Sequence, residues 1–147
     1  MSEYVFISYA RKDGKDFAQR LYDDLKQNSI EAWMDTHDIR AGKEWYRELE
    51  HAIDAANKFI VVLTPGSVES MYVENEIIAA IDGGIEVTPL LALDCKMPLA
   101  LKRLQYIDFR RDYARAFEEL YKVLQPQEDT TPVVSENAPT GPKRIGV

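Results

Sequence analysis

FIVVLT, residues 59–64, is the stretch of this chain that most clearly predicts a β-strand. It contains no charged side chain, and an unbroken apolar run of this length fits a strand that is covered on both faces. Pro65 and Gly66 follow it and end the strand. Strands buried on both faces are typical of parallel sheets whose connecting helices lie on either side. The rest of the chain should therefore alternate between strands and helices.

Other short apolar runs have the length and the β-branched or aromatic content of strands. They are YVFI (4–7), IEAWM (30–34), EVTPLLAL (86–93) and LQYIDF (104–109). Pro89, inside the run 86–93, cannot donate a ladder hydrogen bond, so it indicates a strand end, a bulge or a sheet edge.

Between these runs, apolar residues recur every three or four positions, as they do on one side of a helix. The pattern predicts helices around Phe17, Leu21 and Leu25; Trp45, Leu49, Ala52, Ile53 and Ala56; Val73, Ile77, Ala80 and Ile81; and Tyr113, Phe117, Leu120, Tyr121 and Leu124. Gly83 and Gly84 should end the third of these helices. The alternation predicts an α/β fold: a flavodoxin-like, doubly wound sheet of five parallel strands with helices on both faces, in three layers.

The composition limits the classes of function. With 147 residues, of which 46% are hydrophobic and 29% charged, the chain has the size and balance of one globular domain. A net charge of -7 argues against nucleic-acid binding, because phosphate contacts need clustered Lys and Arg. Cys95 has no second cysteine to pair with, and His37 and His51 add too few ligands for a zinc site. We therefore expect no metal.

The composition changes near the C-terminus. From Gln125 onward the chain is rich in Pro, Thr, Ser and Glu. We expect a folded domain at residues 1–125 and, at 126–147, a disordered tail or a linker to a further domain. We find no N-terminal signal segment and no apolar run near the roughly 20 residues that span a bilayer. A cytoplasmic protein without membrane insertion is expected.

The segments that leave the strand ends are the place to look for a ligand site, because doubly wound folds bind ligands beyond the carboxyl ends of their strands. These segments are 8–13, 35–45 and 64–76. None carries the G-x-G-x-x-G or G-x-x-x-x-G-K-[ST] pattern, which argues against a dehydrogenase or a P-loop phosphotransferase. A phospho-acceptor domain is also disfavoured, because SYARKD and LTPG stand where it would need acidic residues.

Four collinear segments resemble one known family. They are YVFISYARKD (4–13), AWMDTHDIRAGKEW (32–45), FIVVLTPGSVES (59–70) and SMYVENEI (70–77). In this order and spacing they resemble the Toll/interleukin-1 receptor (TIR) domain family, over about residues 3–124. The aromatic-x-x-x-Glu pattern at Tyr72 and Glu76 is similar to that of bacterial-type and NAD-cleaving members. Those members usually have Trp where this chain has Tyr72.

Tyr72 and Glu76 are one helical turn apart and so lie on the same side of the predicted helix. By the resemblance, Glu76 is the catalytic residue and Tyr72 a stacking or positioning surface. One carboxylate fits this chemistry, because nicotinamide leaves NAD⁺ as a neutral molecule and needs no general acid, unlike the alkoxide that ordinary glycosidases protonate. An ionised Glu can stabilise the developing oxocarbenium-like charge. The other interpretation is that Glu74 and Glu76 are both solvated flanks of an amphipathic helix.

The resemblance implies further site residues. Together with Tyr72, the expected substrate-binding residues are Ser70, Arg11, Tyr9, Ala10, Asp35 and Trp45, and the expected self-association loop comprises Asp38, Ile39, Arg40, Ala41, Gly42 and Lys43. Structural alternatives stay open for several: Arg11 as a surface residue, Asp35 as a turn former, Trp45 as a packing anchor and Ser70 as a helix cap.

Two functions are therefore compared. The first is an NAD⁺ glycohydrolase, an NAD⁺ nucleosidase that releases nicotinamide and ADP-ribose or a cyclised variant, active on self-association in immune-type signalling such as antiphage defence. NAD⁺ would then be the substrate, and no cofactor is expected. The second is a non-catalytic module that recruits other TIR domains. The same fold serves both, so the fold does not choose between them.

Overall fold

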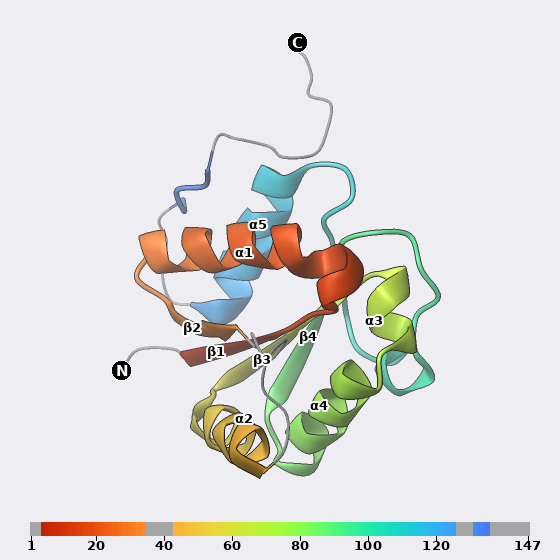
Figure 1. The fold of residues 1–147 in the computed structure, drawn as a ribbon. Coiled ribbons are helices and arrows are strands. Elements are labelled where there is room, and N and C mark those ends of the chain that lie inside the picture. The colour runs from red at the N-terminus through yellow and green to blue at the C-terminus, as the bar shows by residue number, and fades with distance from the viewer. Residues whose placement is uncertain (1–3, 35–42, 126–130, 136–147) are drawn as a thin grey trace.

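Five parallel strands form one sheet in the order β2-β1-β3-β4-β5 (Figure 1). The structure is a computed structural model that describes residues 4–34, 43–125 and 131–135, without the side chains of 43–46, 48, 49 and 72. The strands are β1 (Tyr4–Ser8), β2 (Glu31–Met34), β3 (Lys58–Leu63), β4 (Glu86–Leu91) and β5 (Ile107–Asp108). The predicted doubly wound parallel sheet is confirmed.

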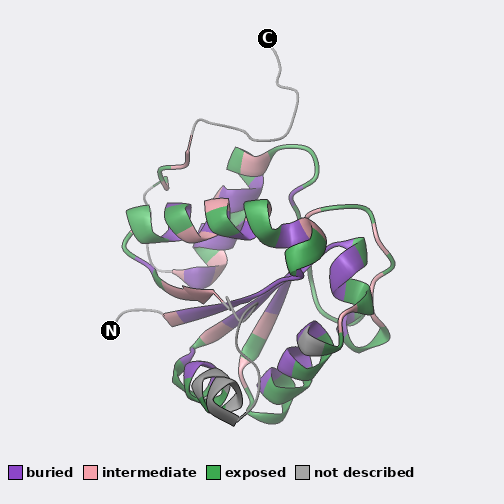
Figure 2. Cartoon of the chain, viewed as in Figure 1, coloured by how far each residue is buried: buried purple, intermediate pink, exposed green. Residues whose placement is uncertain are grey.

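Helices cover both faces of the sheet, with α1 and α5 on one side and α2 and α4 on the other (Figure 1). The helices are α1 (Arg11–Gln27), α2 (Lys43–Ala55), α3 (Pro65–Glu69), α4 (Met71–Asp82) and α5 (Tyr113–Leu124), with a 3-10 turn η1 (Leu99–Leu101). Along β1, Val5 and Ile7 pack under α1 and α5, whereas Phe6 joins the core on the α2 and α4 side. Figure 2 shows the buried residues along the strands between these layers.

The direction of strand order changes at β1. β2 pairs with one edge of β1 and β3 with the other, where Ser8 lies opposite Val61. The connections after β1 and β3 therefore leave the sheet on opposite sides, and doubly wound folds usually bind ligands beyond the carboxyl ends of strands arranged in this way.

Several elements differ from the sequence prediction. α1 begins at Arg11, so the polar residues 11–14 already belong to the helix that was predicted around Phe17, Leu21 and Leu25. Lys43, expected in the self-association loop, is the first residue of α2. β5 is limited to Ile107–Asp108, and α3 and η1 were not predicted, because elements this short show no full period of apolar residues.

Pro89 lies inside β4, opposite Val61 of β3. The C=O of Leu91 accepts a hydrogen bond from the N–H of Phe109 at 2.9 Å, so the backbone groups of Leu91 and, by alternation, of Pro89 face β5. β5 pairs only with Leu90 and Leu91. The missing N–H of Pro89 therefore faces the part of β4 that β5 does not reach and costs no ladder bond there, although β4 lies between β3 and β5 and is not an edge strand.

Residues 131–135, inside the expected tail, lie against α1 (Figure 1). The domain boundary at residue 125 stays a prediction. Among the described residues, no helix has both the length and the apolar character that crossing a bilayer requires.

Candidate active site

The carboxylate of Glu76 is buried beside the carboxyl end of β1. Glu76 lies on α4 and is 2% exposed, whereas Glu74, two residues earlier on the same helix, is exposed. The Oγ of Ser8 donates a hydrogen bond to Oε1 of Glu76 at 2.5 Å. The interpretation of Glu76 as a solvated helix flank is therefore wrong, and for Glu74 it agrees with the structure.

Ser8 is positioned by the alternation of side chains along β1. It is the last residue of the strand, it is 0% exposed, and it points to the same side of the sheet as Phe6, toward α4. Val73, Ile77 and Ala80 seat α4 on this side of the core. The two packed elements thus bring together groups that are 68 residues apart in the sequence.

A second, partly buried contact holds α1 and α3 together near the carboxyl ends of β1 and β3. Asp13 accepts hydrogen bonds from Oγ1 of Thr64 at 2.7 Å and from the N–H of Gly66 at 2.8 Å. Thr64 in turn caps α3, since its hydroxyl accepts from the N–H of Ser67 at 3.1 Å. These contacts fix the start of α3 after β3 and, through it, the approach of the chain to α4.

A family model described as "TIR domain" matches residues 5–121. The match spans all five strands and most of the described helices. The chain belongs to the TIR domain family.

Two curated relatives of this TIR domain carry named activities. The 2' cyclic ADP-D-ribose synthase BtTIR of Bacteroides thetaiotaomicron is 29% identical over 72 residues, 49% of this chain and 25% of that protein. The NAD(+) hydrolase sarm1 of Drosophila melanogaster is 28% identical over 95 residues, 59% of this chain and 7% of that protein. The chain thus spans a quarter or less of the length of these relatives.

Solved structures share the fold. The TIR domain of the Toll-related receptor TRR-2 from Hydra magnipapillata superposes with a TM-score of 0.71 at 21% identity, covering 82% of this chain and 97% of that one. At this level of identity the likeness shows the fold alone.

Of the predicted substrate-binding residues, four have described side chains. Tyr9 is buried in the core between the sheet and α1, and Ala10, also buried, precedes α1 as its N-cap residue. Arg11 is exposed in the first turn of α1. Ser70 caps α4, because its Oγ accepts from the N–H of Val73 at 3.2 Å. Their substrate contacts stay predictions.

The remaining predicted residues lie outside what the structure describes. The side chains of Tyr72, Trp45 and Lys43 are not described, although all three belong to helices. Asp35 and the loop residues Asp38, Ile39, Arg40, Ala41 and Gly42 lie in the undescribed segment 35–42.

Ser8 is the site residue that the sequence prediction did not assign. Its signal was present: a small polar residue that ends an apolar strand, on the same side as Phe6, in the segment expected to border the site. Within the described ranges, no three His, Cys, Asp or Glu side chains are grouped to hold a metal ion.

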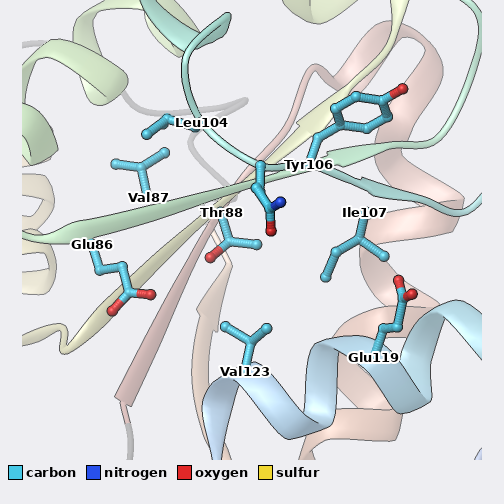
Figure 3. A pocket seen from close by; sticks show the side chains of 9 residues that line it. Glu86, Val87, Thr88, Leu104, Tyr106, Ile107, Glu119 and Val123 are labelled. Atoms are coloured by element: carbon cyan, nitrogen blue, oxygen red, sulfur yellow. The ribbon is translucent and has the colours of Figure 1, made fainter.

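Two cavities of this TIR domain lie elsewhere. One, of about 760 Å³, opens at the amino end of β4, between the 104–107 segment and the side chains of Glu119 and Val123 on α5 (Figure 3). The other, of about 490 Å³, lies between α4 and η1 and is lined by Glu74 and Ile77. Neither is lined by Glu76, so Glu74 and Glu76 face different surroundings.

Proposed function

We propose that this TIR domain is an NAD⁺ glycohydrolase, which cleaves the nicotinamide–ribose bond and releases nicotinamide with ADP-ribose or a cyclised form of it. The observation that carries the proposal is the buried carboxylate of Glu76, bonded to Ser8 at the carboxyl edge where strand order reverses. The named activities of the bacterial and fly relatives support the same reaction class.

The reaction needs one anionic group near the ribose. When the bond to nicotinamide breaks, its electron pair leaves with the nicotinamide nitrogen, which becomes neutral, and positive charge develops on the ribose. An ionised Glu76 would stabilise that charge. Ser8, through its bond to Oε1, orients the carboxylate and acts as a positioning residue. Attack by water on the ribose then gives ADP-ribose and a proton, whereas attack by a group of the same molecule gives a cyclised product.

We further infer, from the family resemblance, that substrate contacts come from Tyr72, Ser70 and Arg11, and that activity depends on self-association through the loop 38–43. On this proposal NAD⁺ is the substrate and no cofactor takes part. The biological setting proposed is immune-type signalling in a bacterial-type system.

The test is nicotinamide release from NAD⁺ by the full chain at high protein concentration with a crowding agent. We compare the parent with Glu76→Gln, which keeps the size of the side chain and removes its charge, and with Glu74→Gln, the matched control on the same helix. Loss of one group that stabilises charge in a transition state costs about 100-fold or more in rate. We expect that loss for Glu76→Gln, and the parent rate for Glu74→Gln.

The same experiment decides against the proposal in two ways. Equal rates for all three proteins would mean that the catalytic carboxylate is elsewhere. No nicotinamide at any concentration from folded parent protein would favour the alternative, a non-catalytic TIR interaction module. Thermal unfolding of each variant checks that a reduced rate of nicotinamide release is not caused by unfolding of the protein.

A further inference from the structure

Residues 131–135 bind across the C-terminal half of α1 through both their main chain and a side chain. The amide group of Asn28 contacts one residue twice: its Nδ2 donates to the C=O of Val133 at 2.6 Å, and its Oδ1 accepts from the N–H of Val133 at 2.8 Å. A side-chain amide used in this way recognises an extended backbone and not a particular side chain. This contact therefore selects a conformation.

Ser135 is contacted at every polar atom. Its N–H and Oγ donate to the two carboxylate oxygens of Asp24 at 3.0 and 3.2 Å. Its Oγ and C=O accept from the guanidinium of Arg20 at 2.8 and 3.1 Å. The intervening Val134 packs against the core cluster that α1 and α5 share. Together, these side chains of α1 and its C-cap bind the backbone of residue 133 and the serine at 135, while the apolar residue at 134 packs against the core.

The receiving side chains are themselves held in place. Asp24 is 1% exposed and accepts a hydrogen bond from the hydroxyl of Tyr113 at 2.7 Å, which ties α1 to α5. Arg20 lies over the ring of Tyr113, 3.5 Å from its centre. A buried carboxylate costs free energy unless donors surround it, and Ser135 supplies two of those donors.

We propose that Arg20, Asp24, Asn28 and Tyr113 form a recognition site for an extended peptide of the pattern x-apolar-Ser, and that its occupant is the chain's own segment 133–135. Only residues 126–130 separate Gln125, the C-cap of α5, from residue 131. A short connection of this kind keeps a weakly binding segment at high effective concentration. The site lies at the C-terminal end of α1, whereas Ser8 is in β1, just before the N-terminal end of α1, and contacts Glu76 on α4. The inference therefore does not depend on the proposed activity.

The test is residue-resolved amide hydrogen exchange on the full chain, measured at two protein concentrations. The N–H groups of Val133 and Ser135 are bonded, whereas no hydrogen bond from the N–H of Val134 occurs within the described residues. We expect Val133 and Ser135 to exchange at least about tenfold more slowly than in an unstructured peptide, and Val134 to exchange faster than both. The protection should be the same at both concentrations.

Variants sharpen the test. Asn28→Ala should abolish the protection at Val133, whereas Gln27→Ala, an exposed neighbour on the same helix, should keep it. Exchange of the core amides of Leu21 and Leu25 reports whether α1 remains folded. Unprotected Val133 and Ser135 in the parent would overturn the proposal. Protection that disappears on dilution would overturn the assignment to the same chain, because a second copy would then supply the segment.

Discussion

At the scale of single residues, the contact between Ser8 and Glu76 links the candidate site to the stability of the fold. Both side chains are buried, and their bond joins the end of β1 to the middle of α4. Removing one partner of such a buried pair leaves the other without that bond, and the cost is about 1–3 kcal/mol. Position 8 is therefore a place where stability and the proposed chemistry can be measured on the same variants.

We predict that Ser8→Ala lowers the free energy of unfolding by about 1–3 kcal/mol. Measured with Glu76→Ala, which removes the acceptor, and with the double variant in urea, the pair should show coupling of at least about 0.5 kcal/mol, since directly bonded groups are not additive. Nicotinamide release by Ser8→Ala should fall less than for Glu76→Gln, because Ser8 orients the carboxylate and does not replace it. Additive effects on stability would contradict a direct bond.

Gly66 and Gly14 differ in the space that each leaves for an added Cβ, so substitutions by alanine can be compared at the two positions. A Cβ on Gly66 would lie 2.5 Å from Oδ1 of Asp13 and would displace the carboxylate that bonds the N–H of Gly66. A Cβ on Gly14 would meet its neighbours at 3.7 Å or more, and Gly14 lies inside α1. We predict that Gly66→Ala destabilises the protein by about 1–3 kcal/mol.

The control, Gly14→Ala, should be neutral or stabilising by up to about 1 kcal/mol, because alanine is the better helix former. Urea unfolding midpoints of the two variants, with equal dependence on urea, provide the measurement. A Gly66→Ala protein as stable as Gly14→Ala would mean that Asp13 moves aside without cost.

At the scale of elements, variants of Ser70 can distinguish its role as the cap of α4 from its proposed role in substrate binding. Its hydroxyl caps α4, the helix that carries Glu76. Replacing an N-cap serine by alanine costs about 1 kcal/mol, whereas aspartate caps equally well. We predict that Ser70→Ala lowers the free energy of unfolding by about this amount and that Ser70→Asp does not.

Nicotinamide release by these two variants then tests the substrate role. If Ser70 only caps α4, activity should follow stability and be kept in Ser70→Asp. If the hydroxyl binds the ribose, Ser70→Asp should keep its stability and lose activity, because a second carboxylate replaces a neutral donor.

The long elements were predictable because their residues repeat. The helix around Val73, Ile77 and Ala80 shows enough turns to define a buried side, and the predicted α4 is confirmed. β5 was predicted too long and α3 was not predicted, because two or five residues contain no period to detect. Their positions depend on contacts with distant segments, such as the bonds from Asp13 to the start of α3.

At the scale of the whole molecule, the fold class followed from the order of the elements, while the pairs that build the candidate site did not. The resemblance singled out Glu76, and the structure adds that its carboxylate is buried. Ser8 was missed as its partner because only the packing of α4 on β1 brings the two together. In the same way, a polar C-terminal composition gave no sign that Ser135 contacts Asp24.

Tyr113, on α5, connects this helix to α1. Its hydroxyl donates a hydrogen bond to Asp24, and its ring lies under the guanidinium of Arg20. Burial and, next, the hydrogen bond to Asp24 raise the pKa of Tyr113 above its usual value. A raised pKa means that the unfolded chain loses its proton first, near pH 10, so the stability that Tyr113 contributes is present below that pH and is lost as the pH rises further.

We predict that Tyr113→Phe is less stable than the parent by about 1–3 kcal/mol at pH 8, because Asp24 loses a donor. The difference should shrink steadily between about pH 10 and pH 11, because only the parent has this group to ionise on unfolding. Urea unfolding of both proteins across this range measures it, and a difference that stays constant with pH would mean that Tyr113 titrates alike in the folded and unfolded chain.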